Sequence, residues 1–535
     1  MSKTQLQLDR KLIIGTRGSK LAMWQANYIK DKLVALGYQA DLKVIKTQGD
    51  IIQHLRFDKI EGKGFFTKEL EESLFKKEID LAVHSHKDLP TVNPEGLIIA
   101  AVTEREDPAE LLIVHKDCID LSKKLMLKHN ATVGTSSNRR KAQLAGLRPD
   151  LEFADLRGNI QTRLQKLRDE QYDAIVLAKA GVVRVEMDLS DFHVIEISPL
   201  EVIPAPAQGA LAIQIREDDT QLKEVLSNIH EAEVSDNIGI ERKILNLFDA
   251  GCHAPLGSYC IKTDDHYECW TSVADTADDF PQRLYIKEQN ADVLVEKVYK
   301  AFKTERKFPE RVFISREIDE HSYFGRAMED LKIQLDARSL INIFPIVKKL
   351  DSYILKHVDW IFFNSKNAIE HFFALEPILS KKTKFGVVGS GSADKLKQFG
   401  KEPDYSGEAF GIKMDEIAME FATIVSGQTV LFPRAKDSLL SMQKYLDEKT
   451  KVIDLPVYET VLKKEIPASS ANVLIFTSPS NVEAYFAENL LDPSQKVISI
   501  GHSTGKVLDR LGVKYSLPYS PDEIGLAEAV FGLDI

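Results

Sequence analysis

The most constraining feature of the chain is an alternation between apolar strand-like runs and amphipathic helical patterns over roughly its first 300 residues. The segment "KLIIGTRGS" (11–19) predicts a strand that runs into a turn, and "LAMWQANYIKDKLVALG" (21–37) predicts a helix that ends at Gly37. The same succession recurs in "ATVGTSSNRRKAQLAG" (131–146), with a Thr/Ser-rich turn between strand and helix. This alternation favours an α/β architecture.

The length of the chain and two changes in pattern indicate several domains. A chain of 535 residues is too long for one hydrophobic core, and its length predicts about three to five domains. The segment "VIPAPAQGALAIQIRE" (202–217) carries two prolines ahead of a β-like run, which predicts a crossing back between two lobes. Pro309 and a fresh strand pattern, "RVFISR" (311–316), mark the start of a separate second part.

The second part contains an internal repeat. The segment "DWIFFNSKNAIEHFF" (359–373) matches "NVLIFTSPSNVEAYF" (472–486), and "VVGSGSADKLKQFG" (387–400) matches "SIGHSTGKVLDRLG" (499–512). The matched serines, 365 and 478, are 113 residues apart, and the matched glycines, 389 and 501, are 112 apart. Two independent matches at nearly one offset predict two similar α/β lobes, each with a strand–serine–helix and a strand–glycine–helix unit.

Charge and composition exclude several classes of protein. The formal net charge is −11 and the pI is about 5.7, which argues against a protein that binds nucleic acid through its phosphates. The chain contains no run of about 18 apolar residues, and its N-terminus lacks the apolar stretch of a signal peptide. We therefore expect a cytoplasmic protein that binds neither nucleic acid nor a membrane.

The cysteines and histidines do not form the pattern of a metal site. The four cysteines lack CxxC spacing and are too few for a disulfide scaffold: Cys118, Cys252, Cys260 and Cys269. His84, His86 and Asp88 alternate in "AVHSHKDLP" (82–90), and alternation along a strand would place their side chains on one face. Lys87 would repel a cation there, and no other histidine cluster complements the three. We expect no metal ion.

Arginines recur where strands turn into helices. Six of them occupy such turns or the first helical turn that follows: Arg17, Arg139, Arg140, Arg157, Arg163 and Arg184. Ligands of open α/β sheets bind beyond the carboxyl ends of the strands, and a guanidinium group pairs bidentately with a carboxylate. Each arginine alone is as easily explained by surface pairing with the acidic excess. The set, in a net acidic chain, favours a ligand with several carboxylates.

Three further features each allow two interpretations when only the neighbouring residues are considered. Asp88 lies before Leu89-Pro90, where a catalytic carboxylate and a turn-forming aspartate are equally suited. The basic, glycine-containing segment 48–70 suits an exposed loop, or a mobile flap over a cleft. Cys252 lies on a Gly/Pro turn in "DAGCHAPLGSY" (249–259), where a buried apolar side chain is the ordinary interpretation and a reactive thiolate the alternative.

Nine motifs, in this order, resemble the porphobilinogen deaminase (hydroxymethylbilane synthase) family. They span about residues 11–300: "IGTRGSKLAMWQA", "EGKGFFTKEL", "LAVHSHKDLP", "EREDPAE", "VGTSSNRRKAQL", "LRGNIQTRL", "YDAIVLAKAGVVR", "PAQGALAI" and "AGCHAPLGSY". The resemblance implies three domains, of which two are like the lobes of periplasmic binding proteins and the third carries the cysteine loop. The sequence has Ala207 where the family frequently has glycine before Gln208.

The same resemblance implies roles for individual residues. It implies that Cys252 holds a dipyrromethane cofactor through a thioether, and that Asp88 contacts pyrrole nitrogens as the catalytic residue. It implies that acetate and propionate groups of the cofactor and growing chain are bound by Arg17, Arg139, Arg140, Arg157, Arg163 and Arg184. Further contacts are implied for Ser19, Lys87, Ser136 and Ser137, with Lys63 on the flap.

The second half resembles the uroporphyrinogen-III synthase family. The resemblance is carried by the "FxS…NxxxxF" repeat, by "SIGHSTGKVLDRLGV" (499–513) and by "LPVYETV" (455–461). It implies a functional role for Tyr458, which matches a tyrosine often implicated in the family, and it implies that Ser478 and Thr504 lie in turns that face the cleft between two lobes. The alternative for these three side chains is helix capping and lobe packing.

We therefore predict an α/β enzyme that condenses four porphobilinogen molecules to hydroxymethylbilane and closes this linear tetrapyrrole to uroporphyrinogen III. The predicted deaminase domains are lobe 1 (1–103 with 199–222), lobe 2 (104–198) and a cysteine domain (223–307). The predicted synthase-like module is 308–535, with lobe A (309–346 with 460–535) around lobe B (350–455). We expect a monomer. The alternatives are a deaminase with a degenerate second half, and a small-anion sensor of periplasmic-binding architecture.

Overall fold

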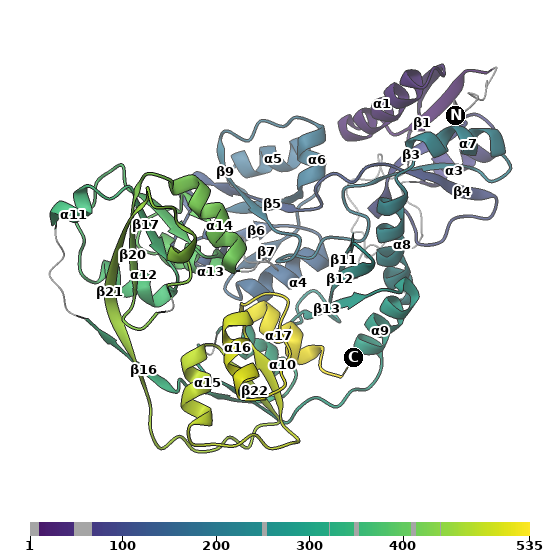
Figure 1. Cartoon of the computed structure of the whole chain (residues 1–535). Coiled ribbons are helices and arrows are strands. Elements are labelled where there is room, and N and C mark those ends of the chain that lie inside the picture. Colours follow the sequence, from purple (N-terminus) through teal and green to yellow (C-terminus); the bar gives the residue numbers. More distant parts are fainter. Residues whose placement is uncertain are drawn as a thin grey trace. The chain divides into compact units, whose positions relative to one another are not determined.

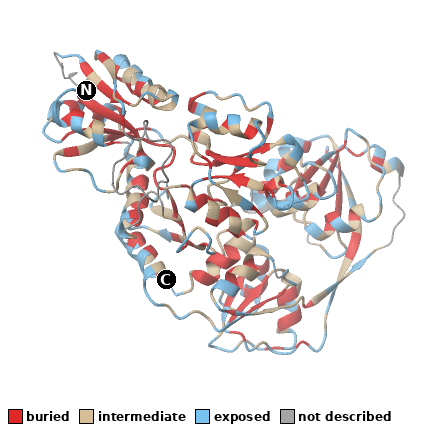
Figure 2. Ribbon diagram, turned by 180° about the vertical axis from the view of Figure 1, so that it is seen from behind, coloured by how far each residue is buried: buried red, intermediate tan, exposed pale blue. Residues whose placement is uncertain are grey.

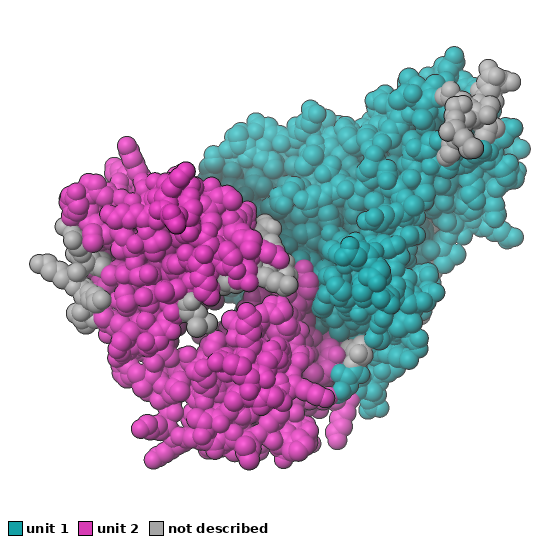
Figure 3. Space-filling view, in the orientation of Figure 1, with its two compact units in different colours: residues 1–119, 127–306, 534–535 teal, residues 120–126, 307–533 magenta. Residues whose placement is uncertain are grey.

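The computed structural model describes residues 10–47, 67–248, 254–319, 321–346, 352–407, 414–438 and 440–534. The chain forms two compact units, residues 1–119 with 127–306 and 534–535, and residues 120–126 with 307–533 (Figure 3). None of the helices in the described part is both long and apolar enough to cross a membrane.

The first sheet of unit 1 has the strand order β2-β1-β3-β10-β4. Its strands are β1 (Leu12–Thr16), β2 (Ala40–Val44), β3 (Leu81–Ser85), β4 (Leu97–Val102) and β10 (Leu211–Arg216). The helices of this lobe are α1 (Lys20–Ala35), α3 (Lys68–Phe75) and α7 (Thr220–Leu226). Strands β1, β2 and β3 are parallel, whereas β10 runs antiparallel to β3 and β4. All six residues of β10 are buried, and they include two polar side chains, Gln214 and Arg216.

The second sheet repeats this topology with the order β7-β6-β8-β5-β9. Its strands are β5 (Glu110–His115), β6 (Thr132–Gly134), β7 (Glu152–Ala154), β8 (Ala174–Ala178) and β9 (Phe192–Ile197). Its helices are α4 (Asn138–Leu147), α5 (Ile160–Arg168) and α6 (Lys179–Arg184). Strands β6, β7 and β8 are parallel, and β5 is antiparallel to β8 and β9. In both sheets, the antiparallel neighbour of the three parallel strands directly follows a segment that crosses from the other sheet; it is β10 in the first sheet and β5 in the second. Figure 1 labels β1, β3 and β4 of the first sheet and β5, β6, β7 and β9 of the second.

The crossover, residues 198–210, returns the chain from β9 to β10 in the first sheet, as the prolines in this segment predict. Ala207 is buried in a left-handed conformation, with φ of 65°. Glycine adopts this conformation without a steric penalty, which accounts physically for the glycine that the resemblance leads one to expect there. Gly209 has φ of 94°, and a Cβ there would lie 2.1 Å from the carbonyl oxygen of Glu106. Both residues fix the backbone conformation of the crossover.

A third sheet of unit 1 is an antiparallel meander of β11 (Leu256–Thr263), β12 (His266–Val273) and β13 (Gln282–Glu288). Helices α8 (Ala232–Leu247) and α9 (Ala291–Lys303) contact it. Glu241 of α8 is fully buried and pairs with Arg105, whose Nη1 lies 2.7 Å from Oε1. The same carboxylate accepts hydrogen bonds from the backbone N–H of Ala207 (2.7 Å) and of Cys260 (2.9 Å). One buried anion thus ties the crossover to the meander.

Unit 2 contains two sheets. The four-stranded sheet, β15-β14-β22-β23, is parallel and consists of β14 (Arg311–Ile314), β15 (Gln334–Ala337), β22 (Val473–Phe476) and β23 (Lys496–Ser499). The six-stranded sheet, β16-β21-β20-β17-β18-β19, consists of β16 (Ile341–Pro345), β17 (Trp360–Phe363), β18 (Lys384–Val387), β19 (Tyr405–Ser406), β20 (Thr429–Ala435) and β21 (Lys451–Leu462). Buried residues lie on both the strands and the helices (Figure 2), and β17 and β22 are buried throughout.

The helices of unit 2 are interspersed with its strands along the chain. They are α10 (Tyr323–Asp330), α11 (Ser352–Lys356), α12 (Lys366–Phe373), α13 (Ser390–Lys397), α14 (Met414–Val425), α15 (Pro479–Phe486), α16 (His502–Arg510) and α17 (Glu523–Phe531). Short 3-10 turns complete the chain at η2 (His86–Asp88), η3 (Lys116–Cys118), η4 (Lys124–Met126), η5 (Ser227–Ile229) and η6 (Gln443–Tyr445). The mixed α/β fold class predicted from the alternation is confirmed.

The predicted repeat in unit 2 appears as two pairs of matching helix caps. Ser365 and Ser478 precede α12 and α15 with backbone angles (φ, ψ) of −158°, 156° and −159°, 157°, and both hydroxyls accept a helix N–H. Gly389 and Gly501 precede α13 and α16 with angles of −175°, 179° and −173°, 176°. Similar sequence segments therefore build similar strand-to-helix turns, as the offset predicts.

The connection between the two sheets of unit 2 differs from the predicted lobe boundary. We assigned residues 309–346 to lobe A, but β16 (341–345) pairs antiparallel with β21 in the six-stranded sheet. Strand β21 itself extends to Leu462, beyond the predicted boundary at 455–460. The two segments that connect the lobes pair with each other because each satisfies the backbone groups of the other.

Candidate functional site

Strand β3 of the first sheet ends in a 3-10 turn that presents Asp88. The strand stops at Ser85, and His86–Asp88 form η2, so the alternation of His84 and His86 does not continue along one strand face. His84 remains in the strand, with Nε2 at 3.2 Å from Gln214 Oε1, and burial lowers its pKa to about 4. Burial, with Arg242 nearby, lowers the pKa of His86 to about 3. Both imidazoles are therefore neutral near pH 7.

The side chains that follow His86 differ in exposure. Asp88 is exposed, whereas Lys87 is half-buried and donates from Nζ to Gln208 Oε1 at 3.2 Å. Burial lowers the pKa of Lys87 to about 8, against the opposing effect of Asp88. Within the described ranges, no group of three or more His, Cys, Asp or Glu side chains is arranged to hold a metal ion.

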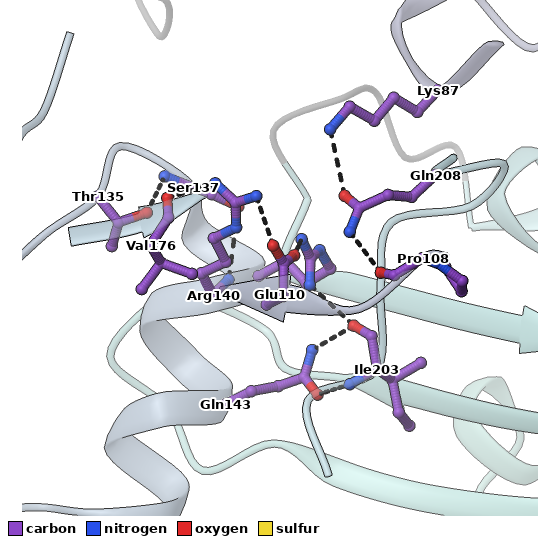
Figure 4. A network of polar contacts seen from close by, with 11 residues as sticks. Lys87, Pro108, Glu110, Thr135, Ser137, Arg140, Gln143, Val176, Ile203 and Gln208 are labelled. Atoms are coloured by element: carbon purple, nitrogen blue, oxygen red, sulfur yellow. Dashed lines mark hydrogen bonds and ion pairs between the residues drawn. The ribbon is translucent and has the colours of Figure 1, made fainter. Parts of the chain in front are cut away.

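Gln208 connects Lys87 to the second sheet. Its Nε2 donates to the carbonyl of Pro108 at 2.7 Å while Oε1 accepts from Lys87 (Figure 4). The side chain is fully buried, so both ends of its amide are committed. The sequence analysis did not single out Gln208. Its only signal was a polar residue between small residues in "PAQGA".

Glu110, at the start of β5, lies between the first two arginines of α4. Its carboxylate oxygens lie 2.6 Å from Arg139 Nη2 and 2.7 Å from Arg140 Nη2 (Figure 4). Burial alone would raise the pKa of Glu110, but Arg140 and Arg139 lower it to about 2. Glu110 was also missed by the sequence analysis, although an acidic residue opening the apolar run "ELLIVH" is a signal of a buried ion pair.

The two arginines of this pair are not equivalent. Arg139 donates from Nη1 to the carbonyl of Ile203 at 2.8 Å, on the crossover, so its guanidinium holds the fold together. Arg140 donates from Nη1 to the carbonyl of Val176 at 3.1 Å, and its Nε is buried with no hydrogen-bond partner in the described part of the chain. Of the two, Arg140 retains donor capacity for a ligand.

Arg163 belongs to the same electrostatic neighbourhood. It lies in the first turn of α5, and its Nε donates to the carbonyl of Gly158 at 2.7 Å. Burial and the charge of Arg140 lower its pKa to about 10, while Asp88 opposes this shift. These mutual effects indicate that Arg163, Arg140 and Asp88 lie near one another. Their membership of a common binding site stays a prediction.

Arg184 ends α6 and contacts the crossover and the first lobe. Its Nη2 donates to the carbonyl of Gly209 at 2.5 Å, and its guanidinium carbon lies 5.5 Å from the ring centroid of Trp24. The side chain is 8% exposed, and its Nε is buried without a partner in the described residues. Burial lowers its pKa.

The predicted serine contacts occupy helix caps and turns. Ser19 caps α1 and accepts from the N–H of Ala22 at 3.2 Å, and Ser137 caps α4. Ser136 is exposed, and its hydroxyl donates to the carbonyl of Leu156 at 2.9 Å. These bonds position the turns, and they account for the serines even without a ligand.

Two further arginines lie at strand-to-helix turns, as predicted. Arg17 directly follows β1 and is half-buried, and its charge contributes to lowering the pKa of His84. Arg157 is half-buried ahead of α5, and its carbonyl accepts from Lys166 Nζ at 3.3 Å. Their roles in ligand binding stay predictions.

Two predicted site residues lie outside the described residues: Cys252, in the connection between α8 and β11, and Lys63, in the predicted flap. The other three cysteines, Cys118, Cys260 and Cys269, are free thiols.

In unit 2, the predicted site residues have structural partners. The Tyr458 hydroxyl lies 3.2 Å from Ser365 Oγ, which caps α12, and burial raises the pKa of Tyr458. Ser478 caps α15 and binds the N–H and the side chain of Asn481. Thr504 is buried in α16. Capping and packing, the alternative interpretation, therefore account for at least two of the three.

The site of unit 1 has the chemistry of a receptor for carboxylates. Cationic side chains from both sheets meet at Asp88 and the crossover: Lys87, Arg140, Arg163 and Arg184. Two guanidinium Nε atoms lie buried without an acceptor in the described residues, which costs about 1–3 kcal/mol each unless an anion binds. The comparisons with known families identify the class of protein as an enzyme of tetrapyrrole biosynthesis that uses a dipyrromethane cofactor.

Residues 12–224 match the family model described as porphobilinogen deaminase, dipyromethane cofactor binding domain, and residues 325–528 match that of uroporphyrinogen-III synthase HemD. The porphobilinogen deaminase of Oceanobacillus iheyensis is 44% identical over 269 residues, which are 50% of this chain and 85% of that protein. That of Bacillus cereus is 44% identical over 258 residues, 48% of this chain and 82% of the relative. The chain belongs to the porphobilinogen deaminase family and carries a uroporphyrinogen-III synthase domain behind it.

A solved structure, the uroporphyrinogen-III synthetase of Helicobacter pylori, is similar to part of this chain, with 21% sequence identity and a TM-score of 0.30. The similarity covers 41% of this chain and 98% of the Helicobacter pylori chain.

The position of Glu110 predicts how the stability of unit 1 depends on pH. The pKa of Glu110 is lowered from 4.5 to about 2 in the folded chain. Between pH 4.5 and about pH 2, the unfolded chain therefore binds a proton at Glu110 that the folded chain does not bind. The carboxylate contributes stability that is fully present above about pH 4.5 and is lost as the pH falls through 2. In urea unfolding from pH 7 to pH 3, the difference between the native protein and Glu110→Gln should therefore shrink on acidification.

The matched control is Glu296→Gln, whose carboxylate pairs with Lys300 on the exposed face of α9. This variant should differ from the native protein by less than about 0.5 kcal/mol at every pH. A Glu110→Gln deficit that stays constant from pH 7 to pH 3 contradicts the assigned ion pair.

Proposed function

We propose that the first half condenses four porphobilinogen molecules, with release of ammonia, to hydroxymethylbilane on a dipyrromethane primer bound to Cys252. We further propose that the second half closes this linear tetrapyrrole to uroporphyrinogen III with inversion of the last ring. The pyrrole substrates carry acetate and propionate groups, and the two halves are ordered so that the product of the first is the substrate of the second.

The observation that carries the first proposal is the excess of buried positive charge around Asp88 and along the crossover. Arg140 and Arg184 each have a buried Nε that lacks an acceptor in the described residues, and Lys87 has a pKa of about 8. Glu110 is already shared between Arg139 and Arg140 and cannot neutralise the rest. Carboxylates of a pyrrole chain supply the missing acceptors, with charge-assisted hydrogen bonds.

Asp88 is suited to the reacting centre because its carboxylate is exposed among these cations. Positive charge develops on a pyrrole when ammonia leaves and when the next carbon–carbon bond forms. A carboxylate beside the pyrrole N–H stabilises this charge through a preorganised electrostatic interaction. The surrounding cations bind the side-chain carboxylates and keep the ring at Asp88.

The residues present fit a dipyrromethane group. Its carboxylates require donors such as the two unpaired Nε atoms, and the residues that would bind it are Arg140, Arg163, Arg184 and Lys87. Arg139 contributes indirectly, by fixing Glu110 and the crossover. When bound, this cofactor supplies a free pyrrole carbon to which substrate units are added.

In the second half, Tyr458 supports the synthase proposal through its position. It lies on β21, which joins the two lobes, and its hydroxyl contacts the cap of α12. Ser478 and Thr504 lie at or near the N-termini of α15 and α16, where backbone N–H groups favour anions. A tetrapyrrole with several carboxylates has the chemistry that such turns bind.

Intact-protein mass spectrometry tests the cofactor attachment. After incubation with porphobilinogen and denaturation, the native chain should be heavier than its sequence mass of 60.2 kDa by one dipyrrole unit. Cys252→Ser should have the sequence mass, because it lacks the sulfur that forms the thioether. Cys118→Ser is the control and should keep the adduct, since Cys118 Sγ instead donates to Asp173. The proposed attachment to Cys252 is overturned if Cys252→Ser carries the adduct, or if the native chain carries none.

Substitution of Asp88 tests its catalytic role. Asp88→Asn keeps the size of the side chain but removes its charge, so kcat for porphobilinogen consumption should fall by about 10²–10³. The chain offers a matched control, because His115-Lys116-Asp117 repeats the sequence His-Lys-Asp at a second 3-10 turn. Asp117→Asn should have native kinetics. If Asp88→Asn has close to the native rate, Asp88 is a turn residue.

The identity of the cyclic product tests the second half. With porphobilinogen as the only substrate, oxidised products separated by chromatography should be mainly uroporphyrin III. Formation of the symmetric isomer alone means that the second half is catalytically inactive. Tyr458→Phe should lower the share of isomer III, because it removes the hydroxyl beside Ser365.

Tyr405→Phe is the control in the same sheet, since the Tyr405 hydroxyl is engaged by Glu420. It should leave the isomer ratio unchanged. An unchanged ratio in Tyr458→Phe, in a chain that still makes isomer III, shows that Tyr458 has only a structural role.

A further inference from the structure

The guanidinium of Arg184 is held between an aromatic ring and a backbone carbonyl. Its carbon lies 5.5 Å from the ring centroid of Trp24, and Nη2 donates to the carbonyl of Gly209 at 2.5 Å. Gly209 cannot shift easily, because its left-handed backbone lies against the carbonyl of Glu106. These two contacts leave the buried Nε without an acceptor among the described residues.

The indole of Trp24 is itself fixed by its helix. Its ring stacks on Tyr28 with a centroid separation of 5.3 Å and an interplanar angle of 10°. The Tyr28 hydroxyl donates to Glu104 at 2.7 Å, and Lys32 pairs with the same carboxylate. Trp24 therefore presents a rigid face to Arg184.

A second contact binds the end of α6 to the same helix. Lys20, in the first turn of α1, donates from Nζ to the carbonyl of Val185 at 3.0 Å. A Cβ on Gly181 would lie 3.8 Å from the side chain of Leu21, which shows how closely α6 approaches α1. The position of the Arg184 side chain is thus set by residues of the first lobe.

We propose that Trp24 is a positioning residue for Arg184: its indole face and the Gly209 carbonyl orient the guanidinium so that Nε stays available to a substrate or cofactor carboxylate. This inference rests on the proposed function of the first half, in which Arg184 binds such a carboxylate. Without the indole, the long side chain is free to turn its Nε toward water, and the site loses its preformed donor.

Steady-state kinetics with porphobilinogen test the proposal. Trp24→Leu removes the ring face and should raise KM roughly tenfold with kcat changed less than about twofold, the scale expected for a desolvated cation–π contact. Trp24→Phe keeps a weaker aromatic face and should recover part of the loss. Tyr267→Leu is the matched control, since it removes the ring beneath Lys262 on the third sheet, and should have native kinetics.

A double variant separates positioning from general destabilisation. If Trp24 acts through Arg184, the KM of the double variant Trp24→Leu/Arg184→Lys should not exceed the higher of the KM values of the two single variants. Fully additive losses, or a native KM in a folded Trp24→Leu, overturn the proposal. Thermal unfolding of every variant shows which of them are folded.

A spectroscopic measurement gives a result that does not depend on turnover. Trp24 becomes the only tryptophan in Trp270→Phe/Trp360→Phe, because the chain has 3 tryptophans. Its emission should change when porphobilinogen is added, and this change should be absent when Arg184→Leu is introduced. An identical change in both proteins overturns the proposal. If the emission of Trp24 changes on addition of porphobilinogen but no porphobilinogen is consumed, the proposed function is refuted. The inferred contact between Trp24 and Arg184 would still stand in that case.

Discussion

The site of unit 1 depends on one buried carboxylate that is shared by two guanidinium groups. Glu110 lies in the second sheet, and its pKa of about 2 shows that Arg140 and Arg139 outweigh the cost of burying its charge. Because Glu110 fixes the positions of both arginines, the two guanidinium groups can have different functions. Arg139 reaches the crossover at Ile203, and Arg140 keeps an unpaired Nε.

The crossover between the two sheets is the common scaffold of the cationic side chains. Arg139 donates to Ile203, Lys87 to Gln208 and Arg184 to Gly209, all within one short segment. The left-handed conformations of Ala207 and Gly209 fix this segment, and Glu241 binds its backbone from the third domain. Residues from three parts of unit 1 are therefore held in register by one stretch of backbone.

Unit 2 uses its sequence repeat in a different way. The repeated serines and glycines start helices with nearly the same backbone angles in both lobes, so the repeat encodes turns rather than a set of charged groups. The two lobes are not symmetric in their connection, because β16 and β21 pair with each other in only one sheet. Tyr458 lies on this connecting pair and contacts a repeated cap.

The sequence by itself determined the α/β fold class, the family, and the repeat, because strand and helix periodicity and short motifs are local properties. It also placed Arg140 and Arg163 in the first turns of the helices that follow β6 and β7, whereas Arg184 lies at the end of α6. Only the tertiary structure showed that Arg139 is committed to Glu110 and Ile203. It also showed that Gln208 contacts Lys87, that Glu241 binds the crossover, and that Trp24 contacts Arg184. These partners lie far apart in the chain, and the burial that makes a charge or an amide demand a partner exists only once the sheets, the crossover and the third domain have packed together.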